Sequence, residues 1–443
     1  ARIQNAARNA MEWFEVVGER YADTLPPEQF MYSMLTRSQR ISHENLRLRD
    51  KNWLEGYEHW FARQAGVEPS ADGRVPPPMF TPYTMRSVTL PNRIVMSPMA
   101  MYSAKDGVLD DFHLVHLGAR ALGGAGLVFG EMTCVSPDAR ITPGCLGLWK
   151  EEQAAGWRRF VDFVHSNSAS KVGIQLGHAG RKGATKVAWD GIDQPLHEGD
   201  WPLISASALP YLKNSQVPKA MDRADMDRVK ADFVRATELA ASTGADWLEL
   251  HCAHGYLLSS FLSPLTNRRT DEYGGTHENR ARFPLEIFDA IRAVWPQDKP
   301  ISVRLSCNDW FEGGNTPDDA AIFAKMFKNA GADMIDCSSG QVWKEEKPVY
   351  GRLFQTPFSD KIRNEVGIPT IAVGAISEAD HANSVIAAGR ADLCAVARPH
   401  LADPAWVLHE AARIGLTDIA WPKQYYSGKL QYETNLARAA AAK

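Results

Sequence analysis

The chain has 443 residues, of which 44% are hydrophobic and 23% charged, and its 49 Lys and Arg against 53 Asp and Glu give a net charge of -4. This balance is typical of a globular protein with a large core, and it excludes a disordered chain and a strongly basic nucleic-acid binder. No apolar run reaches the ~18 residues that cross a bilayer, and no signal peptide is evident. The six cysteines are far apart, without a Cys-x-x-Cys motif, which favours a reduced, cytoplasmic setting without a bound metal.

In chain order, composition divides the sequence into four parts. Residues 1–66 are rich in Glu, Arg, Ala, Leu and aromatic residues with apolar positions at helical spacing, which predicts a helical segment. Residues 67–78 contain a run of three prolines and predict a linker. Residues 79–425 alternate short apolar runs with helical stretches, and residues 426–443 are expected to form a C-terminal tail.

The alternating part predicts an α/β fold, a (β/α)8 TIM barrel with the helical segment as an N-terminal extension. Clear helix starts are expected at Thr316-Pro317 and at Ser377-Glu378. An open doubly wound sheet is the alternative, but the turn after the first strand, Met99-Ala100-Met101-Tyr102, lacks the glycines that such a sheet normally carries there. The eight expected strands are Arg93–Ser97, Leu127–Met132, Val172–Leu176, Trp247–His251, Ile301–Leu305, Met334–Cys337, Thr370–Val373 and Leu393–Ala397.

Polar residues follow several of these strands, at the end of a barrel where catalytic groups gather. The strongest pattern is His251-x-x-His254-x-Tyr256, in which two imidazoles can donate to one oxygen and a phenol can supply a proton. A zinc pair is the alternative, but no third ligand is near in sequence and helical zinc sites favour His at i and i+4. Arg398 follows the last strand, where barrels often bind phosphate; a salt bridge on the rim is its alternative role. Arg304 in an apolar strand predicts a partner anion.

Several motifs occur in one order along residues 79–425. They are Ser97-Pro98-Met99, Gly173-Ile174-Gln175-Leu176, His178-Ala179-Gly180-Arg181-Lys182, His251…His254…Tyr256, Phe261-Leu262-Ser263-Pro264, Asn267-Arg268-Arg269, Thr270-Asp271-Glu272-Tyr273-Gly274-Gly275 and Glu278-Asn279-Arg280. Together they resemble the Old Yellow Enzyme family of flavin-dependent ene-reductases, especially its bacterial branch. The resemblance implies a barrel with non-covalent FMN at its C-terminal face, NADPH or NADH as reductant, and hydride transfer to an activated C=C bond.

The resemblance also implies roles for residues at matching positions. His251 and His254 would bind the substrate carbonyl oxygen. Tyr256 would deliver a proton to Cα after the flavin N5 gives hydride to Cβ, and Tyr102 would approach the substrate from the other side. The residues implied to bind FMN are Ser97, Pro98, Met99, Ala100, Met132, Gln175, Arg304, Ser339, Gly340, Gly374, Ala397 and Arg398.

Three departures from the family pattern have consequences. Ala100 stands where the family usually has Cys or Thr, so a side-chain hydrogen bond to the flavin is lost and a lower reduction potential is expected. Ala397 stands where the phosphate loop usually has glycine, which requires an ordinary backbone angle. Bacterial relatives often have an arginine in their C-terminal tail that enters the active site of a neighbouring subunit. The corresponding stretch here, Gln424–Gly428, has no arginine, so the sequence does not decide whether the chain forms a homo-oligomer.

The segments Phe30–Ile41 and Asn45–Asp50 resemble the end of a flavin monooxygenase module. That module precedes the barrel in fused enzymes of the salicylyl-CoA 5-hydroxylase and 2-aminobenzoyl-CoA monooxygenase/reductase type. The chain, which begins with Ala1, is then expected to be the C-terminal part of a fusion with an upstream FAD monooxygenase domain; a helical extension that only covers the barrel is the alternative.

A fusion of this kind implies a partly dearomatised or unsaturated aroyl-CoA, or a related enone, as substrate. Arg181, Lys182 and Arg268 are then expected to bind it through the CoA phosphates, with loop packing as their alternative role. The long loop from Ala179 to Met221 is the candidate lid. The alternative functions are a docking module for the upstream hydroxylase, an iron–sulfur relative, which the cysteine spacing disfavours, and a non-redox phosphate-dependent lyase.

Overall fold

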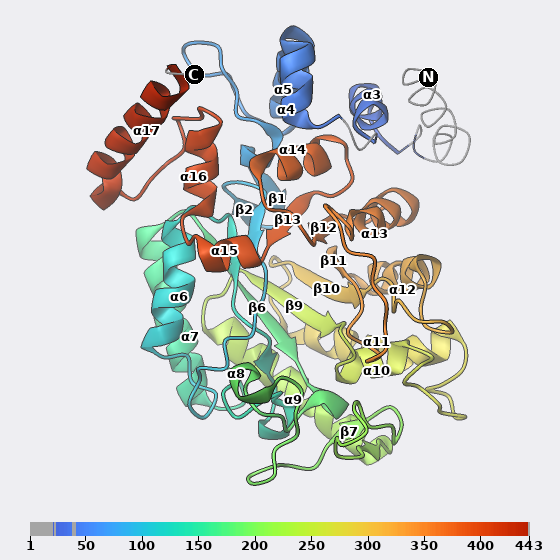
Figure 1. Cartoon of the computed structure of the whole chain (residues 1–443). Helices are drawn as coiled ribbons and strands as arrows, with labels where there is room; N and C mark the ends of the chain where they lie inside the picture. The colour runs from blue at the N-terminus through green and yellow to red at the C-terminus, as the bar shows by residue number, and fades with distance from the viewer. Residues whose placement is uncertain (1–20, 22–23, 38–40, 442–443) are drawn as a thin grey trace.

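The computed structural model describes residues 21, 24–37 and 41–441, and its centre is a closed barrel of eight parallel strands (Figure 1). The barrel strands are β3 (Ile94–Met96), β4 (Leu127–Phe129), β6 (Lys171–Gly177), β9 (Trp247–Cys252), β10 (Ile301–Ser306), β11 (Met334–Ser338), β12 (Thr370–Val373) and β13 (Leu393–Val396). Strand β4 pairs with both β3 and β6, which closes the ring. A short strand, β5 (Thr133–Cys134), extends the edge of β6.

Helices surround the strands, as expected for a (β/α)8 fold. They are α6 (Asp111–Leu122), α7 (Glu151–Asn167), α9 (Arg223–Ser242), α11 (His277–Val294), α12 (Pro317–Ala330), α13 (Thr356–Lys361), α14 (Ala379–Ala387), α15 (Arg398–Ala402) and α16 (Trp406–Arg413). Short additional elements lie in the loops, namely η4 (Gly180–Lys182), α8 (Ala188–Gly191), β7 (Ile204–Ser205), β8 (Lys219–Ala220) and α10 (Leu257–Leu262).

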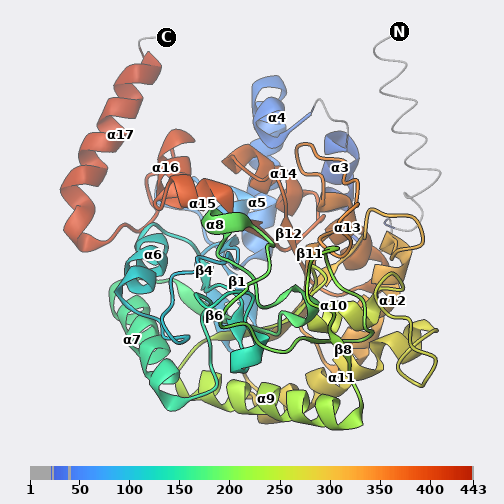
Figure 2. The same ribbon diagram turned by 60° about the horizontal axis from the view of Figure 1, so that its bottom comes forward.

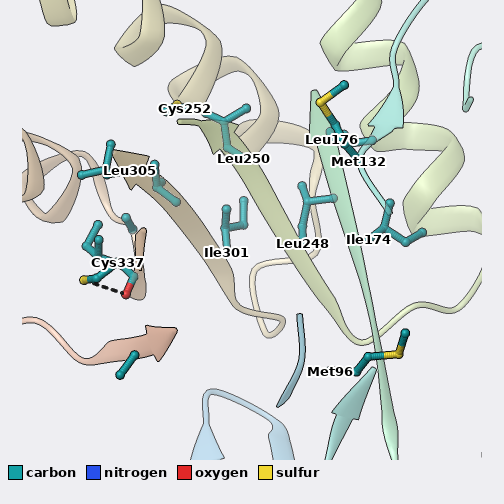
Figure 3. Packing of buried hydrophobic residues seen from close by; sticks show 14 of the residues in the cluster. Met96, Met132, Ile174, Leu176, Leu248, Leu250, Cys252, Ile301, Leu305 and Cys337 are labelled. Carbon is teal, nitrogen blue, oxygen red and sulfur yellow. Dashed lines mark hydrogen bonds between the residues drawn. The ribbon is translucent and has the colours of Figure 1, made fainter. Parts of the chain in front are cut away.

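Side chains alternate along each strand between the barrel interior and the helical layer. In β9, Trp247, Glu249 and His251 share the interior face, and the chain therefore changes from apolar to polar along the strand. The intervening Leu248 and Leu250 belong to the cluster between strands and helices, where Figure 3 shows Leu248 beside Ile174 of β6. One end of the interior is thus an apolar core, and the other end carries ionisable groups.

A hairpin closes the apolar end. Strands β1 (Tyr83–Met85) and β2 (Val88–Leu90) pair antiparallel, and Val88 and Leu90 are buried in the interior cluster with Trp247 and Phe129. Chemistry is therefore confined to the opposite, carboxyl end of the strands.

The N-terminal segment contributes α3 (Pro27–Thr36), α4 (His43–Arg49) and α5 (Lys51–Gln64), which lie beside α14 in both views (Figures 1 and 2). Hydrogen bonds fix this contact: the Tyr57 hydroxyl donates to the Ala387 carbonyl at 2.5 Å, and the His43 backbone N–H donates to Ser384 Oγ at 3.0 Å. The last helix, α17 (Tyr426–Ala441), projects from the body beside α16 (Figure 2).

All eight expected strands are confirmed, and their ends differ from the expected ones by at most three residues. Thr316 caps α12 as expected, accepting from the Asp319 backbone N–H. The start expected at Ser377 was wrong by one residue: Glu378 occupies the cap position of α14 without a side-chain cap, and Glu410 Oε2 accepts from the Ala379 N–H at 2.5 Å instead. Residues 1–20 of the expected helical segment lie outside the described part. Among the described residues, no helix is long and apolar enough to span a membrane.

Candidate active site

Three aromatic side chains gather where β9 ends. His251 is the second-last residue of β9, His254 follows in a left-handed backbone conformation (φ 63°), and Tyr256 immediately precedes α10. The centroids of the His251 and His254 rings are 5.1 Å apart, and Tyr256 lies 5.1 Å from His251 and 6.4 Å from His254, all in edge-to-face arrangements. The structure thus brings together the three residues that the sequence motif predicts.

Each imidazole is anchored through one ring nitrogen. The Ala253 backbone N–H donates to His251 Nδ1 at 3.1 Å, so the neutral ring carries its proton on Nε2. His254 Nε2 pairs with Ser338 Oγ at 2.7 Å, and its backbone N–H donates to Ser306 Oγ at 2.8 Å. Within the part of the chain that the structure describes, neither His251 Nε2 nor His254 Nδ1 has a hydrogen-bond partner, so each ring keeps one nitrogen for a ligand.

Burial sets the protonation states of the cluster. Burial, followed by the positive charges of Arg304 and Lys182, lowers the pKa of His251 well below its ordinary value, and the pKa of His254 falls for the same reasons. Burial also raises the pKa of the Tyr256 phenol well above its ordinary value. At neutral pH the site therefore holds two neutral imidazoles and a protonated phenol, which are hydrogen-bond donors without a net charge.

The basic residues of the neighbouring loops divide into two groups. Arg181 is 1% exposed, and its guanidinium donates to the carbonyls of Leu209, Pro210 and Val342. Lys182 Nζ donates to the carbonyls of His254 and Gln341, both at 2.9 Å. Because their donors hold the loops together, the expected contact of Arg181 and Lys182 with CoA phosphates does not fit this placement.

Arg268, by contrast, is exposed. Among the described residues its side chain has no hydrogen bond or ion pair, and only its backbone N–H is bonded, to Ser207 Oγ at 2.8 Å. It therefore stays available for an anionic group of a substrate.

The wall beneath the histidines carries the residues expected to face the flavin ring. Gln175 is 1% exposed and donates from Nε2 to Glu249 Oε1 at 2.8 Å. Arg304 Nη1 reaches Ser97 Oγ at 3.4 Å, and Arg304 Nε lies 3.4 Å from Asp336 Oδ2. The Sδ atom of Met132 lies next to Gly177, so close that a Cβ there would come within 2.6 Å of it.

Two buried carboxyl groups were not foreseen from the sequence. Burial and the charge of Asp336 raise the pKa of Glu249 to about 8, while burial raises the pKa of Asp336 against the opposing charge of Arg304. The period-two pattern is the signal that could have found them, because Glu249 stands two residues before His251 and Asp336 two before Ser338. Arg304 Nε lacks a hydrogen bond to any described residue, which fits the expected contact with an electron-rich ligand edge.

The residues expected to bind phosphate lie at the ends of β12 and β13. Gly374 has φ 113°. Ala397 has φ -106° and ψ -91°, a combination outside the helical and extended regions, so the ordinary backbone conformation expected of an alanine in place of glycine is not found. Arg398 is exposed, and no hydrogen bond or ion pair from the described residues holds its guanidinium. A free cation beside a glycine turn fits a phosphate group.

Two further expected phosphate contacts are already used within the protein. The Ser339 hydroxyl donates to Gln355 Oε1 at 2.5 Å and accepts from Trp310 Nε1 at 2.8 Å, and the Gly340 N–H donates to the Asn308 carbonyl at 2.8 Å. These bonds shape the loop after β11, and of the expected phosphate contacts Arg398 keeps a side chain without a partner among the described residues.

The loop after β3 forms the remaining side of the site. Pro98, Met99 and Ala100 are half-buried there, and the Tyr102 ring meets the exposed Trp189 of α8 edge-on, at a centroid distance of 6.3 Å. Trp189 belongs to the long loop predicted as a lid, and its contact with Tyr102 places that loop at the mouth of the site.

Comparison with known proteins agrees with this arrangement. The profile of the NADH:flavin oxidoreductase / NADH oxidase family matches residues 78–415. An NADPH dehydrogenase of Geobacillus sp. (strain WCH70) is 42% identical over 357 residues, covering 80% of this chain and 97% of that protein. An NADPH dehydrogenase of Bacillus subtilis (strain 168) is 41% identical over 352 residues, covering 79% of this chain and 98% of that protein.

Two solved structures are also similar. 2-Naphthoyl-CoA reductase in complex with 2-naphthoyl-CoA superposes with a TM-score of 0.69 at 25% identity, and the match covers 78% of this chain but 53% of that one. Morphinone reductase in complex with tetrahydroNAD gives a TM-score of 0.63 at 28% identity, covering 77% and 92%.

The family match and the NADPH dehydrogenase relatives identify an NAD(P)H-dependent FMN oxidoreductase, and the barrel with its neutral donor cluster agrees with that class. The chain belongs to the NADH:flavin oxidoreductase / NADH oxidase family, which is the Old Yellow Enzyme family.

Proposed function

We propose that this protein is an ene-reductase, which reduces a C=C bond conjugated to a carbonyl group and uses Tyr256 as the proton donor. The observation that carries the proposal is the cluster of His251, His254 and Tyr256, in which each imidazole has one anchored and one open nitrogen. Two donors that converge on a carbonyl oxygen stabilise the negative charge that develops there when hydride adds to Cβ.

The chain's residues fit FMN at the carboxyl end of the barrel. Gln175 and Arg304 would hold the polar edge of the ring, and Gly374, Ala397 and Arg398 would hold the phosphate. When bound, FMN would supply the two-electron chemistry, accepting hydride from NAD(P)H and giving it to the alkene. Because Gln175 Nε2 is held by Glu249, the amide oxygen of Gln175 is the atom left to accept a hydrogen bond from the ring.

The remaining steps belong to the side chains. His251 and His254 hold the substrate carbonyl oxygen, which orients the alkene and polarises it. Tyr256 keeps its proton because burial raises the pKa of its phenol, and it gives that proton to Cα as the enolate collapses to the saturated carbonyl compound. Lys182 Nζ, 5.1 Å from the centre of the Tyr256 ring, favours the phenolate that forms.

We also propose a conjugated acyl- or aroyl-CoA as the substrate. The structural similarity to a 2-naphthoyl-CoA reductase bound to its thioester supports this class. Arg268 and Lys186 have no side-chain partner among the described residues, and they stand on loops of the carboxyl end. Both would be free to bind CoA phosphates, in contrast to Arg181 and Lys182. The segments Phe30–Ile41 and Asn45–Asp50 support an upstream aromatic-CoA hydroxylase as the source of this substrate.

The test is anaerobic and spectroscopic. The purified protein is expected to be yellow, to lose its flavin absorbance on addition of NADPH or NADH, and to recover it with 2-cyclohexenone and with crotonyl-CoA. Arg268→Ala is expected to raise the concentration of crotonyl-CoA needed for half-maximal reoxidation and to leave that of 2-cyclohexenone unchanged. Recovery with the enone alone contradicts the thioester proposal, and recovery with neither contradicts the ene-reductase proposal.

A further inference from the structure

The substrate-facing Tyr102 has a backbone conformation that its sequence does not favour. Its φ is 50°, and a non-glycine residue in the left-handed region costs of the order of 1 kcal/mol or more unless its surroundings fix it. Tyr102 stands in the loop after β3, and its ring contacts Trp189. The groups that hold this loop therefore decide where the phenol points.

Two contacts fix the backbone on either side of Tyr102. The N–H of the preceding Met101 donates to Glu131 Oε2 at 3.1 Å. On the other side the Ala104 N–H donates to the Gly144 carbonyl at 2.9 Å. Gly144 packs so closely that a Cβ there would lie 2.3 Å from the Tyr102 carbonyl oxygen. Only the first contact depends on an ionisable side chain.

That side chain belongs to a buried chain of charges. Glu131 is 2% and His113 1% exposed. The second oxygen of Glu131 lies 3.1 Å from His113 Nε2, and His113 Nδ1 lies 3.1 Å from Asp110 Oδ1. Ionised carboxylates only accept hydrogen bonds, so a ring that bonds one at each nitrogen must donate from both and carry a positive charge.

Few other titratable groups face this chain of charges. His116 lies on the same helix, and burial lowers the pKa of its imidazole to about 4, so that it is neutral. The Tyr102 phenol and the Cys134 thiol lie near Glu131, and burial raises the pKa of both, so they are uncharged at neutral pH. The Cys145 thiol also lies near Glu131; burial opposes its ionisation, but hydrogen bonds from Cys134 and Thr142 lower its pKa. Asp111 pairs with Arg159 in an exposed salt bridge.

The balance at His113 favours the charged ring. Burial opposes the charge, but the hydrogen bonds and charges of Glu131 and Asp110 outweigh it, and the pKa of His113 is raised above its ordinary value of 6.5. The stabilising interaction of charged His113 with Glu131 and Asp110 is therefore complete at low pH, and it is lost as pH rises through the raised pKa of His113.

We propose that His113 and Glu131 are positioning residues for substrate binding: protonated His113 orients Glu131, and Glu131 holds the loop that presents Tyr102. When His113 loses its proton, the ring can donate to only one of the two carboxylates, and the Met101 anchor weakens. Affinity for the substrate then falls in alkaline solution while flavin reduction by NADPH is unaffected. The inference rests on the proposed role of Tyr102 in substrate binding.

The test compares two variants of Glu131 with wild type, using NADPH and 2-cyclohexenone from pH 6 to pH 9.5. In wild type, KM for the enone is expected to rise severalfold across the pKa of His113, with little change in the rate of flavin reduction. In Glu131→Gln the amide oxygen can accept from the Met101 N–H while the amide N–H donates to neutral His113. KM for the enone is therefore expected to stay near the value that wild type has at neutral pH and to be independent of pH. In Glu131→Ala the anchor is absent, and KM is expected to be raised about tenfold at every pH.

A second measurement does not depend on turnover. In oxidised holoenzyme labelled at histidine and methionine, the NMR signals of His113 and of the Met101 amide are expected to titrate together, above pH 6.5 in wild type. In Glu131→Gln the His113 titration moves to lower pH. A Glu131→Gln profile like that of wild type, or a Met101 amide that ignores the titration of His113, overturns the proposal. If the two signals titrate together but the enzyme does not reduce 2-cyclohexenone, the coupling of His113 to the Glu131–Met101 hydrogen bond is supported and the proposed function is refuted.

Discussion

Buried histidines occur in two regions of this molecule, and the regions differ in how many ring nitrogens are hydrogen-bonded within the protein. In the N-terminal segment His43 uses both ring nitrogens within the protein, bonding the Tyr32 hydroxyl and Glu58 Oε1 at 2.8 Å each. At the carboxyl end of the barrel His251 is as deeply buried, but only its Nδ1 is bonded to a described residue, at 3.1 Å by the Ala253 N–H.

The difference separates groups that stabilise the fold from groups that serve a ligand. A buried polar atom without a partner costs free energy, so such an atom in a site is a candidate for a hydrogen bond with a ligand. The N-terminal segment completes its hydrogen bonds and adds stacked rings, with Tyr32 and Tyr57 centroids 4.6 Å apart. Among the described residues the site keeps His251 Nε2 open, whereas the terminal nitrogens of Arg181 in the same region donate to backbone carbonyls and hold loops.

The largest expected effect tests whether the open groups carry chemistry. Tyr256→Phe removes the proposed proton donor but keeps the ring, so the oxidative half-reaction with 2-cyclohexenone is expected to slow by about 10²- to 10⁴-fold. Flavin reduction by NADPH should be unchanged. Stopped-flow absorbance measures both halves, and Tyr211→Phe, on the other side of Lys182, is the control. Equal rates in Tyr256→Phe and wild type would show that another group supplies the proton.

The same substitution in both regions sharpens the comparison directly. Asparagine can replace the Nδ1 of a histidine with its side-chain oxygen or amide but cannot reach the position of Nε2. His43→Asn then leaves Glu58 without one of its partners and should lower the free energy of unfolding by about 2–4 kcal/mol. His251→Asn keeps the acceptor for the Ala253 N–H, so stability should change by less than about 1 kcal/mol while KM for the enone rises.

Urea unfolding and steady-state kinetics on both variants provide the measurement. If His251→Asn loses as much stability as His43→Asn and its KM for the enone is unchanged, then His251 stabilises the fold and does not bind the substrate.

Much of the fold follows from the sequence because its elements are local. Eight runs of apolar, often β-branched residues with intervening helical stretches specify the barrel, and each strand was placed within a few residues. The start of α14 was missed because the Ala379 N–H is satisfied by Glu410 of α16, a contact that no local pattern records.

The site follows from the sequence only where its residues are local to one motif. His251, His254 and Tyr256 lie within six residues of each other, and their spacing brings them together. The sequence could not decide between substrate binding and loop packing for Arg181 and Lys182, because the backbone carbonyls that they contact are 28 to 161 residues away. Glu249 inside β9 and Glu131 between β4 and β5 were missed because a buried acid is informative only once its neighbours in the fold are known.

The buried carboxyl of Glu249 gives an intermediate effect that depends on pH. Its pKa is raised from the ordinary 4.5 to about 8, so the associated stability is complete below about pH 4.5 and is lost as pH rises towards about 8. Between these two values the free energy of unfolding should fall by at most about 1.4 kcal/mol per pH unit, and Glu249→Gln, which can accept from Gln175, should remove this slope. Urea midpoints of the holoenzyme at pH 5, 6.5 and 8 check this, with the exposed Glu238→Gln as control. Parallel pH profiles for Glu249→Gln and wild type would mean that Glu249 is ionised.

The smallest expected effect concerns the half-buried Ala100, on the side of the site where the chain departs from its family. If Ala100 lies beside the flavin, Ala100→Cys introduces a side-chain donor that binds the electron-rich reduced ring more strongly than the oxidised ring. A hydrogen bond of about 1 kcal/mol corresponds to roughly 20 mV for a two-electron couple, so the reduction potential should rise by about that amount. Ala100→Val fills similar space without a donor and should leave the potential near the wild-type value. A redox titration in which both variants shift alike attributes the change to packing, and one in which neither shifts places Ala100 away from the ring.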